Sequence, residues 1–310
     1  MANLKFKGRD IIDINDFTKK ELLFILKTAK KFDPEFVKSD RTNYTIAQGK
    51  IAGLLFFEPS TRTEQSFRAA AQKIGMGVIG FNDLNFTSIK KGESFSDTIK
   101  IMDSYADVLI IRHPEVGSAK KAADLSEIPV INGGDGPNQH PTQTLLDLYT
   151  LQKVFGRLDN IKIAYVGDPK HYRPMRGLAV ALNKFKGNKM YGVSPAGLEM
   201  EKEFKNDGFE DVAINMKDLN ETLARIKPDV IYAGRIPKEY MTGDTKKYAY
   251  VINKKTLEVL PKHCVLMHPL PRVGEIDPEV DASPKAIYFK QARNGLYIRE
   301  ALLSLILGRL

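Results

Sequence analysis

The stretch Leu54-Leu55-Phe56-Phe57-Glu58-Pro59-Ser60-Thr61-Arg62-Thr63 joins a short apolar run to a cluster of hydroxyls around an arginine. The apolar run is typical of a buried parallel strand, and the apolar residues from Phe67 to Ile74 follow at helical spacing. We therefore expect the hydroxyls and the guanidinium at a helix N-terminus, where free N–H groups and the helix dipole attract anions. An ordinary Ser or Thr helix cap is the alternative interpretation.

Strand-like and helix-like segments alternate in two successive runs along the 310 residues. This pattern predicts the α/β class, with two doubly wound parallel-sheet domains joined by helices. We expect one domain at 1–140 and the other at 141–290, with a closing helix at 291–310 packing back on the first. Thr18 and Glu21 predict a capping box for an early helix. The predicted strands are 51–57, 78–81, 107–111, 129–131, 161–166, 189–193, 212–214, 230–233 and 264–267, and the predicted helices between them include 65–74, 95–105, 116–124 and 142–155.

The composition excludes several classes of protein. No apolar stretch approaches the roughly 18 residues that span a bilayer, and the first residues lack a signal-peptide core, so we expect a cytoplasmic protein. The single cysteine, Cys264, excludes an internal disulfide, and no metal-binding motif is present. The net charge of +9 is not gathered in a basic block with aromatic residues, which argues against nucleic acid. Solvated helix faces and a small polyanionic substrate both account for the charge.

Polar clusters follow four of the predicted strands. They are Arg112-His113-Pro114, the glycine-rich stretch that ends in His140-Pro141-Thr142-Gln143, Gly234-Arg235, and His268-Pro269-Leu270-Pro271-Arg272. Ligand sites of parallel sheets lie outside the carboxyl ends of the strands. Any one cluster has a structural interpretation, but four in corresponding places predict a binding site.

Two of these clusters and the hydroxyl-rich run together resemble the signature of the aspartate carbamoyltransferase family. They are Ser60-Thr61-Arg62-Thr63, His140-Pro141-Thr142-Gln143 and His268-Pro269-Leu270-Pro271-Arg272. The first two resemble carbamoyltransferases generally, whereas His268-Pro269-Leu270 favours the aspartate over the ornithine enzymes. The resemblance covers almost the whole chain. It implies transfer of the carbamoyl group of carbamoyl phosphate to L-aspartate, an early step of pyrimidine biosynthesis.

The resemblance also implies a role for each matching residue. These roles fit the chemistry, because a site that binds two anionic substrates requires several fixed cationic side chains. Carbamoyl phosphate is expected to bind Ser60, Thr61, Arg62, Thr63, Arg112, His140, Gln143, Pro269 and Leu270. Catalysis is expected from Arg62, Thr63, Arg112 and His140, and aspartate binding from Lys91, Arg173 and Arg235. Ser88 and Lys91 are expected to reach in from a neighbouring subunit, which implies a homotrimer; related enzymes often pair with regulatory chains. No metal or organic cofactor follows from the resemblance.

The chain departs from the family pattern on the aspartate side. Arg173 is followed by Pro174-Met175-Arg176 instead of threonine and histidine, and Pro237 replaces a glutamine. A proline side chain cannot donate a hydrogen bond, so we expect weaker or altered amino-acid recognition unless Lys238 or Arg176 substitutes. The loop at 87–93 is also one residue shorter than the family form.

The helix after the phosphate-binding run carries exchanged charges, because Glu64 and Arg68 stand where the family has arginine and glutamate. Their spacing of four predicts a preserved ion pair, with the acid nearer the favourable end of the helix dipole. We therefore expect the geometry of the anion site to be kept.

Two other classes of function remain open. An oxidoreductase is suggested by Tyr165-Val166-Gly167-Asp168 after a strand, although no Gly-x-Gly-x-x-Gly pattern is present. A non-catalytic anion-binding paralogue, or a carbamoyltransferase with another acceptor, is suggested by Pro237.

Overall fold

The computed structural model describes residues 4–37, 45–236 and 248–310. The chain divides into two compact units, one of Met1–Tyr149 with Arg293–Leu310 and the other of Thr150–Ala292. Both boundaries fall inside helices, α5 (Pro141–Phe155) and α9 (Tyr288–Ile306). Each unit is described by itself below.

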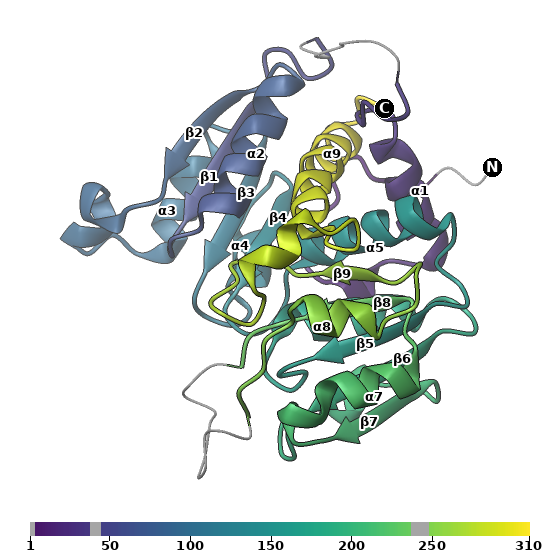
Figure 1. The fold of residues 1–310 in the computed structure, drawn as a ribbon. Helices are drawn as coiled ribbons and strands as arrows, with labels where there is room; N and C mark the ends of the chain where they lie inside the picture. Colours follow the sequence, from purple (N-terminus) through teal and green to yellow (C-terminus); the bar gives the residue numbers. More distant parts are fainter. Residues whose placement is uncertain (1–3, 38–44, 237–247) are drawn as a thin grey trace. The chain divides into compact units, whose positions relative to one another are not determined.

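The first unit contains a four-stranded parallel sheet in the order β2-β1-β3-β4 (Figure 1). The central strands β1 and β3 begin with almost continuous apolar runs, as expected of strands covered on both faces. Right-handed crossovers in this strand order put α2 on one face of the sheet and both α3 and α4 on the other. The elements are β1 (Ile51–Phe56), α2 (Thr61–Lys73), β2 (Gly77–Phe81), α3 (Phe95–Asp103), β3 (Val108–His113), α4 (Ser118–Leu125) and β4 (Val130–Asp135).

The second unit contains a five-stranded parallel sheet in the order β7-β6-β5-β8-β9. Two parallel sheets with intervening helices confirm the predicted fold class. The elements are β5 (Lys162–Val166), α6 (Arg173–Leu182), β6 (Lys189–Ser194), β7 (Phe209–Ala213), α7 (Leu219–Ile226), β8 (Val230–Ala233), α8 (Lys254–Glu258) and β9 (Val265–Met267). Short 3-10 helices of the chain include η1 (Ile14–Asp16), η2 (Leu84–Phe86), η3 (Ser88–Lys91), η4 (Lys202–Phe204), η5 (Met216–Asp218) and η8 (Pro278–Ala282).

Most element boundaries lie close to the predicted ones, and some differ by three or more residues, such as the strand predicted at 129–131, which extends to Asp135 as β4. The strand predicted at 212–214 begins at Phe209, because β7 is an edge strand with mostly exposed side chains and therefore a weak hydrophobic pattern. The helix predicted from 65 begins at Thr61, so the hydroxyl-rich run itself forms its first turn. The helix predicted at 291–310 begins at Tyr288 and ends at Ile306.

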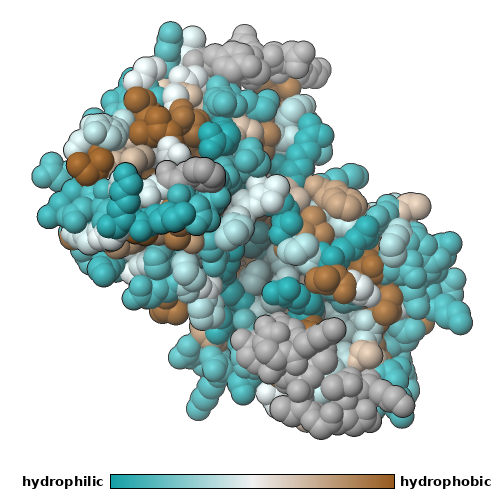
Figure 2. Space-filling view, turned by 90° about the vertical axis from the view of Figure 1, so that its left-hand side faces the viewer, coloured by the Kyte–Doolittle hydropathy of each residue, from teal (hydrophilic) through white to brown (hydrophobic). Residues whose placement is uncertain are grey.

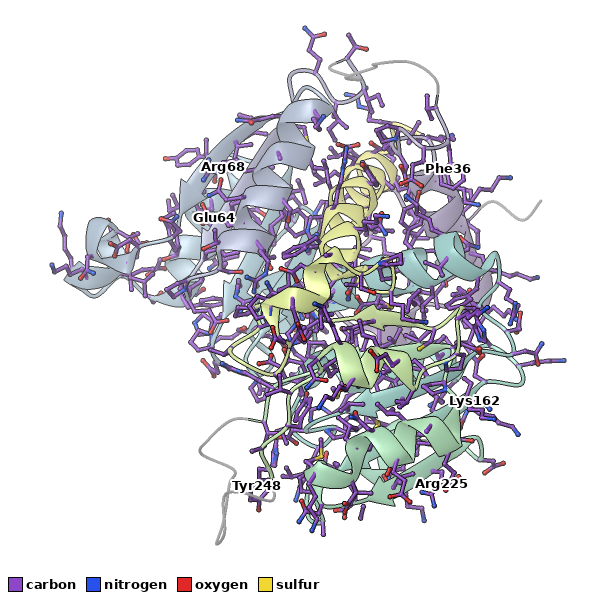
Figure 3. The ribbon with its side chains drawn as sticks, viewed as in Figure 1. Phe36, Glu64, Arg68, Lys162, Arg225 and Tyr248 are labelled. Carbon is purple, nitrogen blue, oxygen red and sulfur yellow. The ribbon has the colours of Figure 1, made fainter. Side chains whose placement is uncertain are left out.

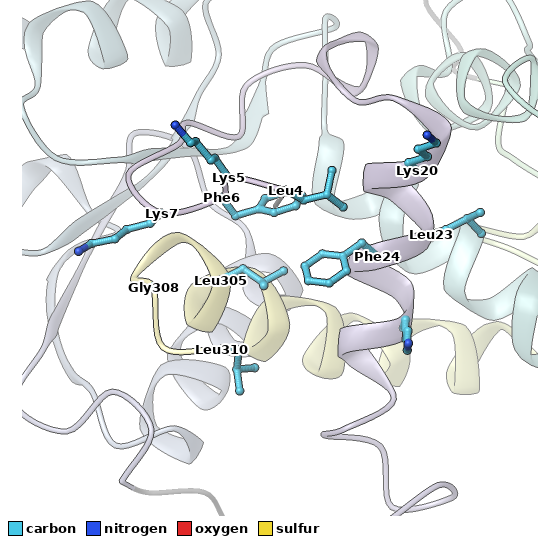
Figure 4. A pocket seen from close by; sticks show the side chains of 11 residues that line it. Leu4, Lys5, Phe6, Lys7, Lys20, Leu23, Phe24, Leu305, Gly308 and Leu310 are labelled. Atoms are coloured by element: carbon cyan, nitrogen blue, oxygen red, sulfur yellow. The ribbon is translucent and has the colours of Figure 1, made fainter. Parts of the chain in front are cut away.

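The early helix α1 (Lys19–Ala29) begins with the predicted capping box, which is confirmed. The amide of Glu21 donates to Thr18 Oγ1 at 3.2 Å, and the amide of Thr18 donates to the Glu21 carboxylate at 2.7 Å. Beside α1 lies a pocket of about 800 Å³ whose wall includes Phe6, Phe24 and Leu305 (Figure 4). None of the predicted site residues lines this pocket.

Hydrophilic side chains cover most of the face shown in Figure 2, where hydrophobic residues gather in patches. In the first unit, Ile101, Tyr105 and Val116 are each at least half exposed. No helix in the described ranges is both long enough and apolar enough to cross a membrane.

Candidate active site

The hydroxyl-rich run forms the junction between β1 and α2. Ser60 occupies the N-cap position with an extended backbone, yet its side chain makes no capping hydrogen bond. The ordinary-cap interpretation is therefore wrong for Ser60. Thr61 and Arg62 are exposed in the first turn of α2, next to the amide groups that a helix start leaves without intrahelical partners.

Thr63 and His140 meet in the interior of the first unit. Thr63 Oγ1 lies 3.3 Å from His140 Nε2, and each residue is only 6% exposed. One comes from the first turn of α2 and the other from the residue before α5. The structure thus brings together two residues from separate motifs that the sequence assigned to the same reacting group.

The turn that carries His140 is held by Asp135, whose role the sequence interpretation missed. The Asp135 carboxylate accepts hydrogen bonds from the side chains of Asn132 and Asn138 and from the amides of Gln139 and Gly117, all between 2.9 and 3.0 Å. Asp135 is almost fully buried. A buried carboxylate with four donors fixes the path of the backbone into α5. The sequence signal that could have indicated this role is the presence of an aspartate inside the glycine-rich stretch.

Arg112 lies at the carboxyl end of β3, beside the end of β1. Its Nη1 donates to the carbonyl of Gly133 at 3.2 Å, and its Nη2 lies 2.7 Å from a Glu58 carboxylate oxygen. The amide of Phe57 donates to the Arg112 carbonyl. The guanidinium is therefore anchored at the sheet edge where Ser60 and Thr63 follow β1. Glu58 was also missed, although it lies two residues before the hydroxyl-rich run that begins at Ser60.

Gln143 lies in the first turn of α5 and is half-buried. Its amide nitrogen donates to Asp147 at 3.0 Å. In this orientation the amide oxygen is the atom turned away from Asp147, and an oxygen is what accepts a hydrogen bond from a carbamoyl NH2 group.

Glu64 and Arg68 form the predicted ion pair on α2, which is confirmed (Figure 3). Arg68 Nη2 lies 3.1 Å from Glu64 Oε1, and the Asn82 side chain donates to both Glu64 oxygens at 3.1 and 2.9 Å. Glu64 is almost fully buried by these partners. Its charge is thus compensated within the helix and the loop after β2.

Ser88 and Lys91, the two residues expected to serve a neighbouring subunit, delimit η3 and are exposed. In the part of the chain that the structure describes, no hydrogen bond joins either side chain to Ser60–Thr63. The predicted contribution to another subunit stays a prediction.

In the second unit, Arg173 begins α6 and Arg235 follows β8, where it is exposed. The ends of β5 and β8 are tied together by Tyr250, whose hydroxyl lies 2.6 Å from the carbonyl of Gly234 and 3.2 Å from that of Val166. Glycine is required beside this tie, because a Cβ on Gly167, whose φ is +125°, would lie 2.0 Å from the Gly234 carbonyl oxygen.

Lys238 and Arg176 are the two residues suggested to compensate for the glutamine that Pro237 replaces. Pro237 and Lys238 lie outside the described residues. The Arg176 guanidinium stacks over the Phe204 ring at 5.1 Å and lies 4.0 Å from the Glu201 carboxylate. Arg176 therefore has partners of its own.

The loop after β9 is organised by a buried His268–Glu275 pair. His268 Nδ1 accepts from the amide of Leu270 at 2.8 Å, so Nε2 carries the proton and donates to Glu275 at 2.7 Å. The other Glu275 oxygen accepts from the amide of Val273. Burial alone would raise the pKa of Glu275, but the hydrogen bonds from His268 and Val273 more than offset it and lower the pKa. Pro269 and Leu270 are thus held in one conformation, with Leu270 at a φ of +57°.

Comparisons with known proteins identify relatives over almost the whole chain. The family model described as "Aspartate/ornithine carbamoyltransferase, carbamoyl-P binding domain" matches residues 9–153, and that described as "Aspartate/ornithine carbamoyltransferase, Asp/Orn binding domain" matches residues 159–306. The aspartate carbamoyltransferase catalytic subunit of Thermococcus onnurineus is 45% identical, covering 98% of this chain and 99% of that one. The chloroplastic aspartate carbamoyltransferase of Oryza sativa is 42% identical, covering 96% and 85%.

Solved structures agree. The catalytic subunit of aspartate transcarbamoylase from M. jannaschii superposes with a TM-score of 0.86 at 40% identity, over 97% of this chain and 98% of that one. The aspartate transcarbamoylase of Trypanosoma cruzi in complex with carbamoyl phosphate and aspartate gives 0.86 at 32% identity, over 97% of both chains. The chain therefore belongs to the aspartate/ornithine carbamoyltransferase family.

Proposed function

We propose that this chain transfers the carbamoyl group of carbamoyl phosphate to the amine of L-aspartate, giving N-carbamoyl-L-aspartate and phosphate. The observation that carries the proposal is the buried contact between Thr63 and His140, 77 residues apart, at the carboxyl edge of the first sheet. The complexes of the related Trypanosoma cruzi enzyme with carbamoyl phosphate and aspartate support the same substrates.

The reaction needs electrostatic help more than an enzymic nucleophile. The aspartate amine attacks the carbonyl carbon, a C–N bond forms, the C–O bond to phosphate breaks, and the departing phosphate accepts the amine proton. Negative charge grows on the carbonyl oxygen in between, and each donor aimed there contributes on the order of 3 kcal/mol. Thr63, Arg112 and His140 are the donors we assign to this oxygen. Holding both substrates in line supplies much of the remaining acceleration.

The phosphate side of the site is assigned to the start of α2. Ser60, Thr61 and Arg62 offer a hydroxyl pair, a guanidinium and the helix N-terminus to the phosphate oxygens. Gln143 accepts from the carbamoyl NH2 group, and the Pro269-Leu270 segment contributes backbone contacts to the same group. In this proposal residues 1–140 with the helix at 291–310 bind carbamoyl phosphate.

The aspartate side is assigned to residues 141–290, with Arg173 and Arg235 on the two carboxylates. Lys91, and Ser88 with it, would be supplied by a neighbouring subunit, so the active form would be a homotrimer in the cytoplasm. The relatives' name, catalytic subunit, supports a search for regulatory chains.

Product formation tests the proposal. Purified protein is incubated with carbamoyl phosphate and either L-aspartate or L-ornithine, and the carbamoylated product is measured. We expect product from aspartate only. Thr63→Val should lower kcat by roughly 10²–10³-fold, the effect of losing one such donor, whereas Thr222→Val, an equally buried threonine on α7, should not.

A panel of other amino acids tests the alternative acceptor, which Pro237 motivates. If another amino acid gives product and aspartate does not, that amino acid is the acceptor in place of aspartate. No product from any amino acid would favour the non-catalytic alternative.

A further inference from the structure

Arg299 is a buried guanidinium without a carboxylate partner among the described residues. It is 3% exposed on α9, its Cζ lies 4.9 Å from the centre of the Phe67 ring, and its Nη2 donates to Thr142 Oγ1 at 3.2 Å. Burial lowers the pKa of Arg299 to about 9, which leaves it charged at neutral pH. Keeping an unpaired charge in the interior costs several kcal/mol, on the order of the usual desolvation penalty, so its surroundings require an explanation.

Gly295, one helical turn before Arg299, provides the space for the guanidinium. A Cβ built on Gly295 would lie 2.3 Å from Arg299 Nη1 and 2.9 Å from Leu146 Cδ2. Any larger residue at 295 would displace the guanidinium or the leucine. The backbone of α9 is therefore shaped to hold Arg299 against α2 and α5.

Arg299 is the first member of a hydrogen-bond relay that ends at Thr63. Arg299 donates to Thr142 Oγ1, which lies 3.5 Å from His140 Nδ1, and His140 Nε2 lies 3.3 Å from Thr63 Oγ1. All four residues are buried in the first unit. The relay thus connects α9, α5 and α2.

The direction of the relay follows from what each group can donate. Arginine has no acceptor, so Thr142 must accept from it. The single hydroxyl proton of Thr142 then has His140 Nδ1 as its acceptor in the described part of the chain. If Nδ1 carried a proton instead, Thr142 Oγ1 could accept from both Arg299 and His140, but the Thr142 hydroxyl proton would then be buried without an acceptor among the described residues.

We propose that Arg299 is a positioning residue that fixes the direction of this relay and so holds His140 with its proton on Nε2. His140 then donates toward Thr63 and toward the carbonyl oxygen of carbamoyl phosphate. Thr63, in turn, keeps its own proton for the substrate. The identity of that substrate rests on the proposed function, but the tautomer of His140 does not.

The ring nitrogen chemical shifts of histidine report the tautomer directly. The full-length protein is labelled with 15N-histidine and measured without substrate. It contains five histidines, and a His140→Asn variant assigns the signal. We expect the wild-type protein to show a protonated Nε2 and an unprotonated Nδ1 at His140.

Two substitutions at Arg299 separate charge-directed positioning from simple packing. In Arg299→Gln the amide oxygen can accept from Thr142, which allows the relay to reverse, so we expect an Nδ1-protonated signal. We also expect kcat to fall on the order of tenfold, the lower end of what partners that orient metal-binding histidines contribute. Arg299→Lys keeps a group that only donates, so it should retain the wild-type tautomer.

Thr142→Val provides a second test if the Arg299 variants do not fold. It removes the relay oxygen, and we expect it to change the His140 shifts, whereas Thr142→Ser should preserve them. Thr144→Val, a buried threonine on the same helix, is the matched control and should leave the tautomer unchanged.

The inference is overturned if His140 in the wild-type protein carries its proton on Nδ1, or if Arg299→Gln and Thr142→Val both keep the wild-type shifts. A wild-type tautomer as expected, in a protein that forms no carbamoyl aspartate, would instead refute the proposed function and leave the relay intact.

Discussion

The buried pair of His268 and Glu275 allows a quantitative test, by replacement of Glu275 with glutamine. The carboxylate uses both oxygens as acceptors, from His268 Nε2 and from the amide of Val273, each at 2.7 Å. A glutamine amide has one oxygen and one NH2 group. In Glu275→Gln, either the imidazole N–H or the Val273 amide must therefore face another donor.

The expected cost follows from this count. Leaving one buried donor without an acceptor costs about 1–3 kcal/mol, and replacing a charge-assisted hydrogen bond by a neutral one costs about 1 kcal/mol more. We expect the variant to lose about 2–4 kcal/mol of stability in the second unit. Glu279→Gln is the matched control, because its carboxylate is 39% exposed and pairs with the exposed Lys254. That change should cost no more than about 0.5 kcal/mol.

The pH dependence of the difference gives an independent check. Since the folded-state pKa of Glu275 is lowered below its ordinary value of 4.5, its contribution to stability is present above that value and is lost as the pH falls through the folded-state pKa. The gap between wild type and Glu275→Gln should therefore be largest at neutral pH and shrink below about pH 4.5.

Urea unfolding followed by hydrogen exchange of residues 268–275 measures both the size and the place of the loss. Faster exchange at Leu270 and Val273 is expected in Glu275→Gln and not in Glu279→Gln. A loss below 0.5 kcal/mol at pH 7, or a gap that widens as the pH falls, would refute the reasoning, because neither can arise from a carboxylate with two buried donors.

Three further predictions concern single residues. Glu64→Arg removes the acceptor of Arg68 and Asn82, so stability should fall by about 1–3 kcal/mol while calorimetry shows no sharp gain in carbamoyl phosphate affinity; a sharp gain would mean that Glu64 repels the anion. Pro237→Gln should lower the aspartate KM by roughly 5- to 150-fold if one hydrogen bond is recovered; an unchanged KM contradicts the assigned role. Burial raises the pKa of the Cys264 thiol to about 12, so mass spectrometry should detect iodoacetamide labelling only in denaturant, and labelling of the native protein would contradict this.

The fold was largely predictable because the strands carry a strong local signal. β1, β3 and β5 are mostly apolar and buried, and their ends lie within two residues of the predicted ones. The order of strands in each sheet was not predicted, since it depends on which crossovers pack well and not on any one segment. The predicted start of β7 lies too far along the chain, because the residues of this edge strand alternate little between buried and exposed.

The candidate site was predictable where its residues are consecutive. Ser60, Thr61, Arg62 and Thr63 form one short run, and its position at a helix start follows from the residues on either side. Glu58 and Asp135 were visible in the sequence but had no assigned role. The partner of Glu58, Arg112, lies on another strand, and Asp135 also holds the amide of Gly117 outside its own turn. Their function as anchors appears only once the sheet is assembled.

Arg299 marks the limit of a local interpretation. Its hydrogen-bond partner Thr142 is 157 residues away, and nothing in the helical pattern of α9 distinguishes a buried arginine from the exposed ones that helices usually carry. The feature that could have drawn attention to it is Gly295, a helix-destabilising residue placed one turn earlier without a capping role. A glycine that costs about 1 kcal/mol of helix stability is best explained by the group it makes room for. Here that group is the Arg299 guanidinium, which acts on His140 through Thr142. The sequence motifs describe His140 well, but they contain no sign of Arg299, the residue that sets the position of the His140 proton in our proposal.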